Sequence, residues 1–170
     1  MSIIESQRAF VERLDRHRGI LQKVSIAYCR DAASRDDLRQ EIVVQLWRSY
    51  GRFDEDGRFS TWMYRIALNT AISFARSRNR KDARVALAEP AILERIPAST
   101  GEPQDERIER IYELVNRLDE LNRAVMLLYL DDHSHAEIAA ILGISPSNAG
   151  TKISRIKERI RRDVAAVPAR

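Results

Sequence analysis

The chain has 170 residues, a formal net charge of +4 and an isoelectric point near 9.5. This length allows one ordinary domain or two small ones, and the basic balance is compatible with a polyanionic partner. The single cysteine, Cys29, excludes an internal disulfide and a cysteine-rich zinc site, and its apolar neighbours predict a buried thiol. No apolar run is long enough to span a membrane and no signal-peptide pattern is present, so we expect a cytoplasmic protein without membrane insertion of its own.

The N-terminal segment shows the apolar spacing of a helix, and no segment of the chain reads as a strand. We expect the first helix to begin at Ser2, where Glu5 completes a capping box, and to bend near Gly19. Its expected buried stripe consists of Phe10, Leu14, Leu21, Val24 and Tyr28.

A second helix is expected from about Ser34 to the aromatic pair Trp47 and Tyr50. Apolar residues recur there every four positions and predict a buried face, made of Leu38, Ile42 and Leu46. The opposite face carries Asp37, Gln40, Glu41 and Val44. An acidic face in a basic domain suits a basic protein surface better than DNA, and a merely solvated face is the alternative.

A loop is expected at residues 51–57, followed by a third helix that begins at Ser60 or Thr61 and ends near Lys81. This region combines aromatic rings, basic side chains and one amide, namely Phe53, Phe59, Trp62, Tyr64, Arg52, Arg58, Arg65, Arg76 and Asn69. Rings stack on unpaired bases, arginines attract phosphates and an asparagine can read a base edge. The combination predicts a surface for a DNA strand whose bases have left the duplex, with buried rings and solvated arginines as the alternative.

Residues 85–105 contain three prolines, one glycine and an excess of acidic side chains, which predict a flexible acidic linker with at most one short helix at residues 91–95. Four further helices are expected at residues 106–118, 122–130, 134–142 and 145–165. The predicted fold class is therefore all-α, with two small helical domains at residues 1–84 and 106–170 joined by this linker. Each domain is close to the lower size limit for a stable core.

The last two predicted helices have the pattern of a helix-turn-helix. Ser134 and Glu137 form a capping box, Gly143 makes the turn, and Ser145 caps a helix with Pro146 at its first position. The expected inner faces consist of Ile138, Ala139 and Leu142 in the first helix and Ala149, Ile153, Ile156 and Ile160 in the second.

Small polar and basic side chains cover the outer face of the last helix: Ser147, Gly150, Thr151, Ser154 and Arg155, with Lys152, Lys157, Arg159, Arg161 and Arg162 adding charge. Small side chains allow a close approach to base edges in a major groove, and the cations hold phosphates. The motif predicts DNA binding without specifying a role, and a solvated basic face is the alternative.

Taken in order, these segments resemble the bacterial extracytoplasmic-function (ECF) sigma factors of RNA polymerase. DLRQEIVVQLW, from Asp37 to Trp47, is similar to the polymerase-binding helix of that family. FSTWMYRIALNTAISFAR is similar to its −10 segment, with matches at Phe59, Thr61, Trp62, Tyr64, Arg65, Ile66, Ala67, Asn69 and Arg76. The C-terminal unit is similar to the second conserved domain of the family, so the resemblance covers nearly all of the chain except the linker.

The resemblance implies that the first domain binds the β′ coiled coil of core RNA polymerase and melts the −10 element. The second domain would read the −35 element and contact the β flap, and an anti-sigma factor would hold the chain inactive. The implied polymerase-binding residues are Asp37, Gln40, Glu41, Val44 and Trp47, with Trp47 packing within its helix.

The implied −10 residues are Arg52, Phe53, Arg58, Phe59, Trp62, Arg65, Asn69 and Arg76. Phe53 and Asn69 fall where the family holds a flipped base, and the arginines would hold the backbone. The implied −35 residues are Ser147, Asn148, Gly150, Thr151, Lys152, Ser154, Arg155 and Lys157.

Some positions depart from the family pattern. Gly150 stands where Lys or Arg is common, which leaves the preferred −35 sequence open, and Ile72 and Ser73 replace a frequent charged pair. His133 and His135 are two residues apart, the wrong spacing for a shared metal on a helix, and we interpret them as turn residues. We expect no metal and no cofactor.

Three other functions are considered. A helix-turn-helix regulator with a helical sensor domain would bind DNA without binding core polymerase. An enzyme is not expected, because the sequence offers no phosphate-binding loop, no nucleophile paired with a base and no metal-ligand set. A purely structural helical adaptor is opposed by the tryptophan-centred segment and the basic last helix.

Overall fold

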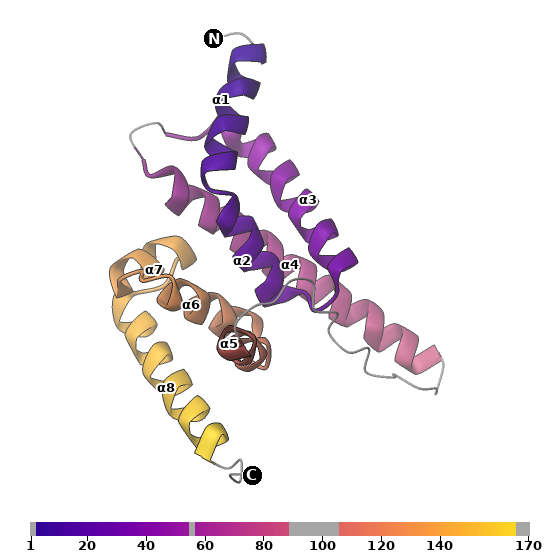
Figure 1. The fold of residues 1–170 in the computed structure, drawn as a ribbon, viewed down its shortest axis with the longest axis vertical. Helices are drawn as coiled ribbons and strands as arrows, with labels where there is room; N and C mark the ends of the chain where they lie inside the picture. Colours follow the sequence, from indigo (N-terminus) through magenta and orange to yellow (C-terminus); the bar gives the residue numbers. More distant parts are fainter. Residues whose placement is uncertain (1–2, 55–56, 89–105, 166–170) are drawn as a thin grey trace. The chain divides into compact units, whose positions relative to one another are not determined.

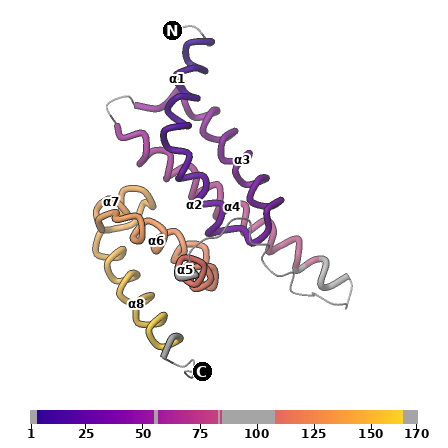
Figure 2. The backbone as a smooth tube through the Cα atoms, in the orientation of Figure 1, coloured from indigo at the N-terminus to yellow at the C-terminus, as the bar shows by residue number. Residues whose placement is uncertain are grey.

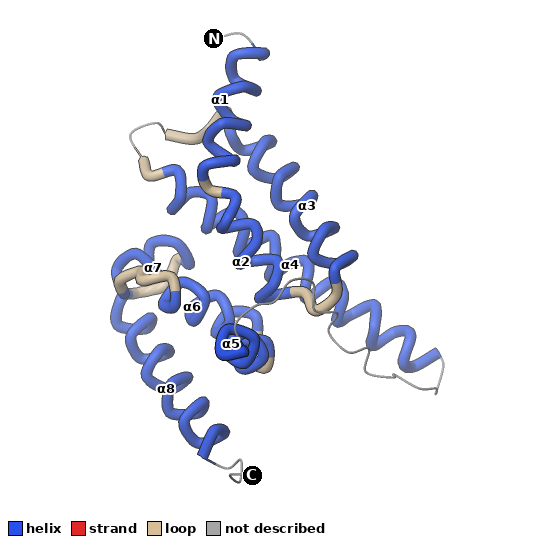
Figure 3. The backbone as a smooth tube through the Cα atoms, viewed as in Figure 1, coloured by secondary structure: helices blue, strands red, loops and turns tan. Residues whose placement is uncertain are grey.

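The computed structural model describes residues 3–54, 57–88 and 106–165, and over these residues every regular element is a helix (Figures 1 and 3). The chain divides into two compact units, Met1–Pro103 and Gln104–Arg170. The all-α prediction is confirmed. The short helix expected at residues 91–95 lies outside the described residues. Within the described ranges, no helix has the length and apolar character needed to cross a membrane.

The first unit contains α1 (Ile3–Arg16), α2 (Arg18–Tyr28), α3 (Ala32–Tyr50) and α4 (Phe59–Ala88). Helices α2, α3 and α4 pack against one another, as Figure 2 shows for the backbone. Their core consists of fully buried side chains, among them Val24, Leu38, Ile42, Leu46, Met63 and Leu68. The predicted buried face of α3 is confirmed, and Cys29 is buried, which raises the pKa of its thiol.

The single N-terminal helix that the sequence predicts is in fact two helices. The break lies at His17, whose φ of −115° and ψ of 15° are not helical, rather than at Gly19. His17 donates its backbone N–H to Leu14 O at 3.1 Å, a tightened turn that ends α1. Leu14 and Leu21 are only half-buried because the break rotates the stripe out of register, whereas Phe10, Val24 and Tyr28 are buried as predicted. Ser2 lies outside the described residues.

Helix α3 begins earlier than predicted because Asp31, not Ser34, caps it. Asp31 Oδ1 accepts hydrogen bonds from Ser34 N at 2.8 Å and from Ser34 Oγ at 2.7 Å. These two bonds hold the pKa of the Asp31 carboxyl below its ordinary value, because they favour the charged form. Ser34 lies inside the first turn and is buried there.

Helix α4 is longer than predicted at both ends. It begins at Phe59 and continues to Ala88 instead of ending near Lys81. Its C-terminal residues contain neither Gly nor Pro, and most are good helix formers, so nothing interrupts the hydrogen-bond pattern until the approach of Pro90. Residues 85–88 of the predicted linker are therefore helical.

The second unit contains α5 (Glu106–Asn116), α6 (Glu120–Leu130), α7 (His135–Leu142) and α8 (Pro146–Ala165). The predicted capping box is confirmed: Ser134 Oγ accepts from Glu137 N at 3.2 Å and Glu137 Oε2 accepts from Ser134 N at 2.9 Å. Ser145 Oγ accepts from Asn148 N at 3.1 Å, so the predicted cap of α8 is also confirmed.

The helix-turn-helix core differs from the prediction at one position of α7 and one of α8. Ile138, Ala139 and Ile141 are buried in α7, whereas Leu142 is only half-buried. Because Ile141 and Ile138 lie three residues apart, they share the face that packs inward. In α8 the predicted residues Ala149, Ile153 and Ile156 are buried, and Ile160 is half-buried near the end of the helix.

Gly143 ends α7 with a φ of +69°, the left-handed conformation that other residues adopt at a cost. We expect Gly143→Ala to lower the free energy of unfolding by about 1–2 kcal/mol, the penalty for an L-residue in this region. Gly19→Ala is the matched control, because Gly19 is helical and its added Cβ meets open space. It should stabilise the chain by up to about 1 kcal/mol. Urea unfolding of both variants checks the opposite signs, and equal shifts would contradict the strain argument.

Candidate nucleic-acid and protein interfaces

The first candidate surface is the outer face of α3. Asp37, Gln40, Glu41 and Val44 are exposed there, and Val44 keeps 43% of its surface open to solvent. Exposed aliphatic side chains beside carboxylates offer both apolar contact and charge to a basic partner.

Trp47 lies one turn further along the same helix. Its ring is 38% exposed, and its other contacts are with Phe10 at 5.2 Å and Tyr50 at 6.2 Å between ring centroids. Trp47 therefore packs against α1 as well as within its own helix, and the solvent-facing part extends the α3 surface.

The second candidate surface contains an aromatic cluster, defined here as Phe10, Trp47, Tyr50, Phe53, Phe59 and Trp62. The ring centroid of Phe53 lies 5.1 Å from that of Trp62 and 5.4 Å from that of Phe59. Phe53 and Trp62 are half-buried and Phe59 is 9% exposed. Three of the predicted −10 residues therefore meet in one place, where α3, the following loop and α4 converge.

Two residues from the N-terminal region, Arg13 and His17, contact this cluster, and these contacts were not predicted. The guanidinium carbon of Arg13 lies 5.3 Å from the centre of the Phe53 ring, and the His17 ring lies 5.2 Å from that of Phe59. His17 Nδ1 is 2.9 Å from Arg13 O, which links the two. The sequence shows only that Arg13 and His17 are four residues apart. This spacing does not indicate which distant loop they contact.

Asn69 lies apart from the aromatic cluster, on the exposed side of α4. It is seven residues beyond Trp62, roughly 10 Å along the helix axis at the rise of an α-helix. Arg65 and Arg76 are exposed on the same helix, and Arg52 and Arg58 are exposed in and next to the loop.

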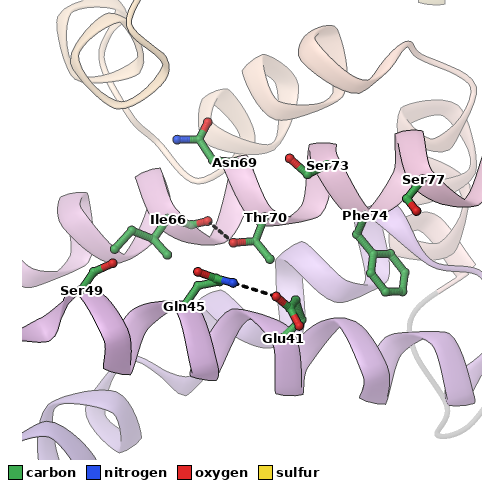
Figure 4. Close-up of a pocket in the computed structure, with 9 residues that line it drawn as sticks. All are labelled: Glu41, Gln45, Ser49, Ile66, Asn69, Thr70, Ser73, Phe74 and Ser77. Atoms are coloured by element: carbon green, nitrogen blue, oxygen red, sulfur yellow. Dashed lines mark hydrogen bonds between the residues drawn. The ribbon is translucent and has the colours of Figure 1, made fainter.

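A groove of about 590 Å³ runs between α3 and α4 (Figure 4). Glu41, Gln45 and Ser49 line it from α3, and Gln45 Nε2 donates to Glu41 Oε1 at 2.8 Å. Asn69 stands at its rim with its amide directed away from α3, as Figure 4 shows. The groove places a residue predicted to bind polymerase, Glu41, beside one predicted to bind the −10 element.

The third candidate surface is the outer face of α8. Ser147, Asn148, Thr151, Ser154 and Arg155 are exposed, as expected for a recognition helix. Three other predicted −35 residues contact neighbouring helices of the same unit.

Lys152, Lys157 and Gly150 each contact another helix. Lys152 Nζ lies 3.4 Å from Asn122 Oδ1, and Lys157 Nζ donates to Tyr129 Oη at 3.0 Å and lies 5.0 Å from the centre of its ring. The two lysines reach α6. A Cβ at Gly150 would lie 3.2 Å from His135 Nδ1, so this position is covered by α7.

An apolar groove of about 290 Å³ in the second unit was not identified from the sequence. It is lined by Ile111, Leu114, Val115, Met126, Tyr129, Leu130, Lys157, Ile160 and Arg161. Ile111 and Leu130 are 42% and 47% exposed, large fractions for aliphatic side chains.

Within the described ranges, no set of three or more His, Cys, Asp or Glu side chains is placed to hold a metal ion. The chemistry on offer is stacking, hydrogen bonding, charge pairing and apolar contact.

Comparison with known proteins gives each unit a counterpart. The family description Sigma-70 region 2 matches residues 14–81, and Sigma-70, region 4 matches residues 108–160. The ECF RNA polymerase sigma factor SigW of Bacillus subtilis is 29% identical over 168 residues, covering 93% of this chain and 90% of its own. The RNA polymerase sigma factor CarQ of Myxococcus xanthus is 31% identical over 160 residues, covering 92% and 89%.

Two solved structures share the fold. CnrH, in complex with the cytosolic domain of CnrY, is 26% identical with a TM-score of 0.68 and covers 95% of this chain and 91% of its own. The sigma factor RpoE of Bartonella quintana, in complex with the anti-sigma factor NepR, is 19% identical with a TM-score of 0.72, covering 95% and 99%. Both sigma-70 regions are thus present in their usual order, and the chain belongs to the ECF family of RNA polymerase sigma factors.

Proposed function

We propose that this chain binds core RNA polymerase through the outer face of α3 and directs it to promoters through two DNA-contacting surfaces. The rings of Phe53, Phe59 and Trp62 and the exposed side of α4 contact the −10 element, and the outer face of α8 contacts the −35 element. The observation that carries this assignment is the presence of both sigma-70 regions in one chain, with most polar and charged side chains of these surfaces exposed and the Phe53 and Trp62 rings half-buried. The chain acts by binding, in the cytoplasm, and the polymerase supplies the catalysis.

At the −10 element, the rings supply the energy that holds an unstacked base. Extruding a base costs a few kcal/mol, and stacking on an aromatic side chain is worth roughly 1–3 kcal/mol. Phe53 and Trp62 are half-buried, so each ring combines a fixed position with an open portion. The cost of extruding the base and the gain from stacking it nearly cancel. Opening a whole bubble therefore requires the binding energy of the polymerase, and the free chain binds promoters weakly.

Asn69 contacts a different part of the same strand. Asn69 is separated from Trp62 by roughly 10 Å along α4, at the rise of an α-helix. Arg65 lies between Trp62 and Asn69 on this helix and Arg76 lies beyond Asn69, and both are exposed and able to hold phosphates of the strand. The spacing of Trp62, Arg65 and Asn69 along one helix supports a strand that follows α4.

At the −35 element, Arg155 and the exposed polar residues of α8 read an intact duplex. Lys152 and Lys157, which reach α6, contribute positive potential and helix packing more than base contacts. The binding should fall steeply with salt, because the phosphate contacts release counterions.

We also propose control by an anti-sigma factor. The relative CnrH forms a complex with the cytosolic domain of CnrY. This chain offers exposed apolar side chains in both units, such as Val44 and Leu130, that a helical partner can cover. Co-expression with a candidate inhibitor and loss of polymerase binding would test the proposal.

Replacing Asn69 with alanine is expected to weaken binding of the polymerase complex to a single-stranded −10 oligonucleotide about 5- to 150-fold, the worth of a lost base contact. Polymerase binding by the variant should be unchanged. Fluorescence anisotropy with a labelled oligonucleotide measures the first quantity and gel filtration the second. Asn79→Ala, ten residues along the same helix, is the control. Equal loss of both activities in Asn69→Ala would remove the −10 assignment.

The function as a whole is tested by run-off transcription with core polymerase on a promoter library. Selective initiation that depends on both elements supports the proposal. A chain that binds a duplex but does not co-purify with core polymerase would instead be the alternative, a helix-turn-helix regulator.

A further inference from the structure

The first residue of α7 and a glycine of α8 form a matched pair. A Cβ placed on Gly150 would lie 3.2 Å from Nδ1 and 3.3 Å from Cε1 of His135. Both distances are tighter than ordinary van der Waals contact, so the His135 ring lies directly over the glycine and uses the space that a side chain would need. A substitution at position 150 must displace the ring.

The ring is also part of the surface that α8 presents. Ser147 and Ser154 are three residues before and four residues after Gly150, so they are its neighbours on the helix surface. Both serines are exposed, and His135 itself is exposed. The imidazole of α7 therefore extends the row of polar side chains on the outer face of α8.

We propose that His135 is a DNA-contacting residue of the −35 surface, and that its ring replaces a side chain at position 150 in contacting a phosphate of the duplex. This inference rests on the proposed function. A ring N–H is a suitable donor to a phosphate oxygen. His135 is also the first residue of an eight-residue helix, where backbone N–H groups face outward and favour an anion. The nearby Glu137 carboxylate is engaged with Ser134 N at 2.9 Å in the capping box.

The test uses the full chain in complex with core polymerase and a duplex promoter selected by the wild-type complex. Loss of one hydrogen bond to a charged group predicts that His135→Ala weakens binding about 10-fold. His135→Lys restores a donor to the phosphate and should restore affinity. The salt dependence of its binding should be steeper than that of His135→Ala by about one charge. Wild-type affinity in His135→Ala, or no rescue by His135→Lys, would overturn the proposal.

A double-mutant cycle tests the pairing itself. Gly150→Ala should weaken binding by no more than His135→Ala does, because the added methyl group shifts the exposed ring by only a few tenths of an ångström. The double variant should be no weaker than His135→Ala alone, because the ring is already gone. Losses that multiply would show that the two residues act independently and would overturn the proposal.

His133→Ala is the matched control, because His133 Nδ1 lies 3.2 Å from Leu128 O and not beside Gly150. It should leave DNA affinity unchanged, and a loss equal to that of His135→Ala would overturn the proposal.

Thermal unfolding of each variant separates a binding defect from a folding defect. If the wild-type complex shows no preference for the −35 element, the proposed function fails. If the wild-type complex does prefer the −35 element and His135→Ala binds DNA as tightly as the wild type, the proposed function stands and only the role of His135 fails.

Discussion

Replacing Glu41 with lysine is expected to weaken binding of the chain to core RNA polymerase at least tenfold, a loss of about 1.4 kcal/mol or more. Glu41 is exposed near the middle of α3, on the face that also carries Asp37, Gln40 and Val44. A basic partner surface gains from its carboxylate, and lysine replaces that attraction with repulsion. Binding to immobilised core polymerase at two salt concentrations measures the effect, which should shrink at high salt.

The fold should tolerate Glu41→Lys, so a loss of polymerase binding would not be caused by unfolding. Glu41 contacts Gln45 through one exposed hydrogen bond of 2.8 Å, and exposed substitutions of this kind shift stability by about 0.5 kcal/mol or less. Glu12→Lys in α1 is the matched control, because it reverses the same charge in an exposed pair with Arg8. Unchanged polymerase binding in Glu41→Lys, or an equal loss in Glu12→Lys, would remove the α3 face as the polymerase contact.

The elements that the sequence predicted well are those with a local physical cause. Ser134, Glu137, Gly143 and Ser145 act within four residues of their own position, so their roles follow from the sequence alone. The buried face of α3 was predicted for the same reason, since apolar residues that recur every four positions define one side of a helix. The end of α4 was missed because helix formers continue past Lys81 without a stop signal.

Contacts between distant residues are what the sequence did not predict at the candidate surfaces. The spacing of Lys152 and Lys157 gave no reason to expect that they reach Asn122 and Tyr129 in α6. Long flexible side chains can bend toward a neighbouring helix, so the face from which a lysine starts does not fix where its ammonium lies. Arg13 is a further example, because its contact with Phe53 depends on the break at His17, which sets the direction of α1.

Replacing Ile138 with alanine should lower the free energy of unfolding by about 2–5 kcal/mol, the range for removing a fully buried isoleucine side chain. Ile138 is completely buried in α7, where it holds the helix-turn-helix together. The second unit is small, so its total stability lies toward the low end of the range for domains. A loss of this size removes much of that stability, and the −35 surface is lost with the fold. Urea unfolding followed by circular dichroism measures the change.

Leu130→Ala provides the comparison that makes Ile138→Ala informative. Leu130 is 47% exposed, so the same kind of truncation leaves a smaller cavity and should cost about 1 kcal/mol or less. Polymerase binding through α3 should survive in both variants, because the two compact units have separate cores. Ile138→Ala should therefore abolish −35 recognition while the chain still binds polymerase. If both activities are lost together in this variant, the two units do not fold independently, and the division of labour between α3 and α8 must be abandoned.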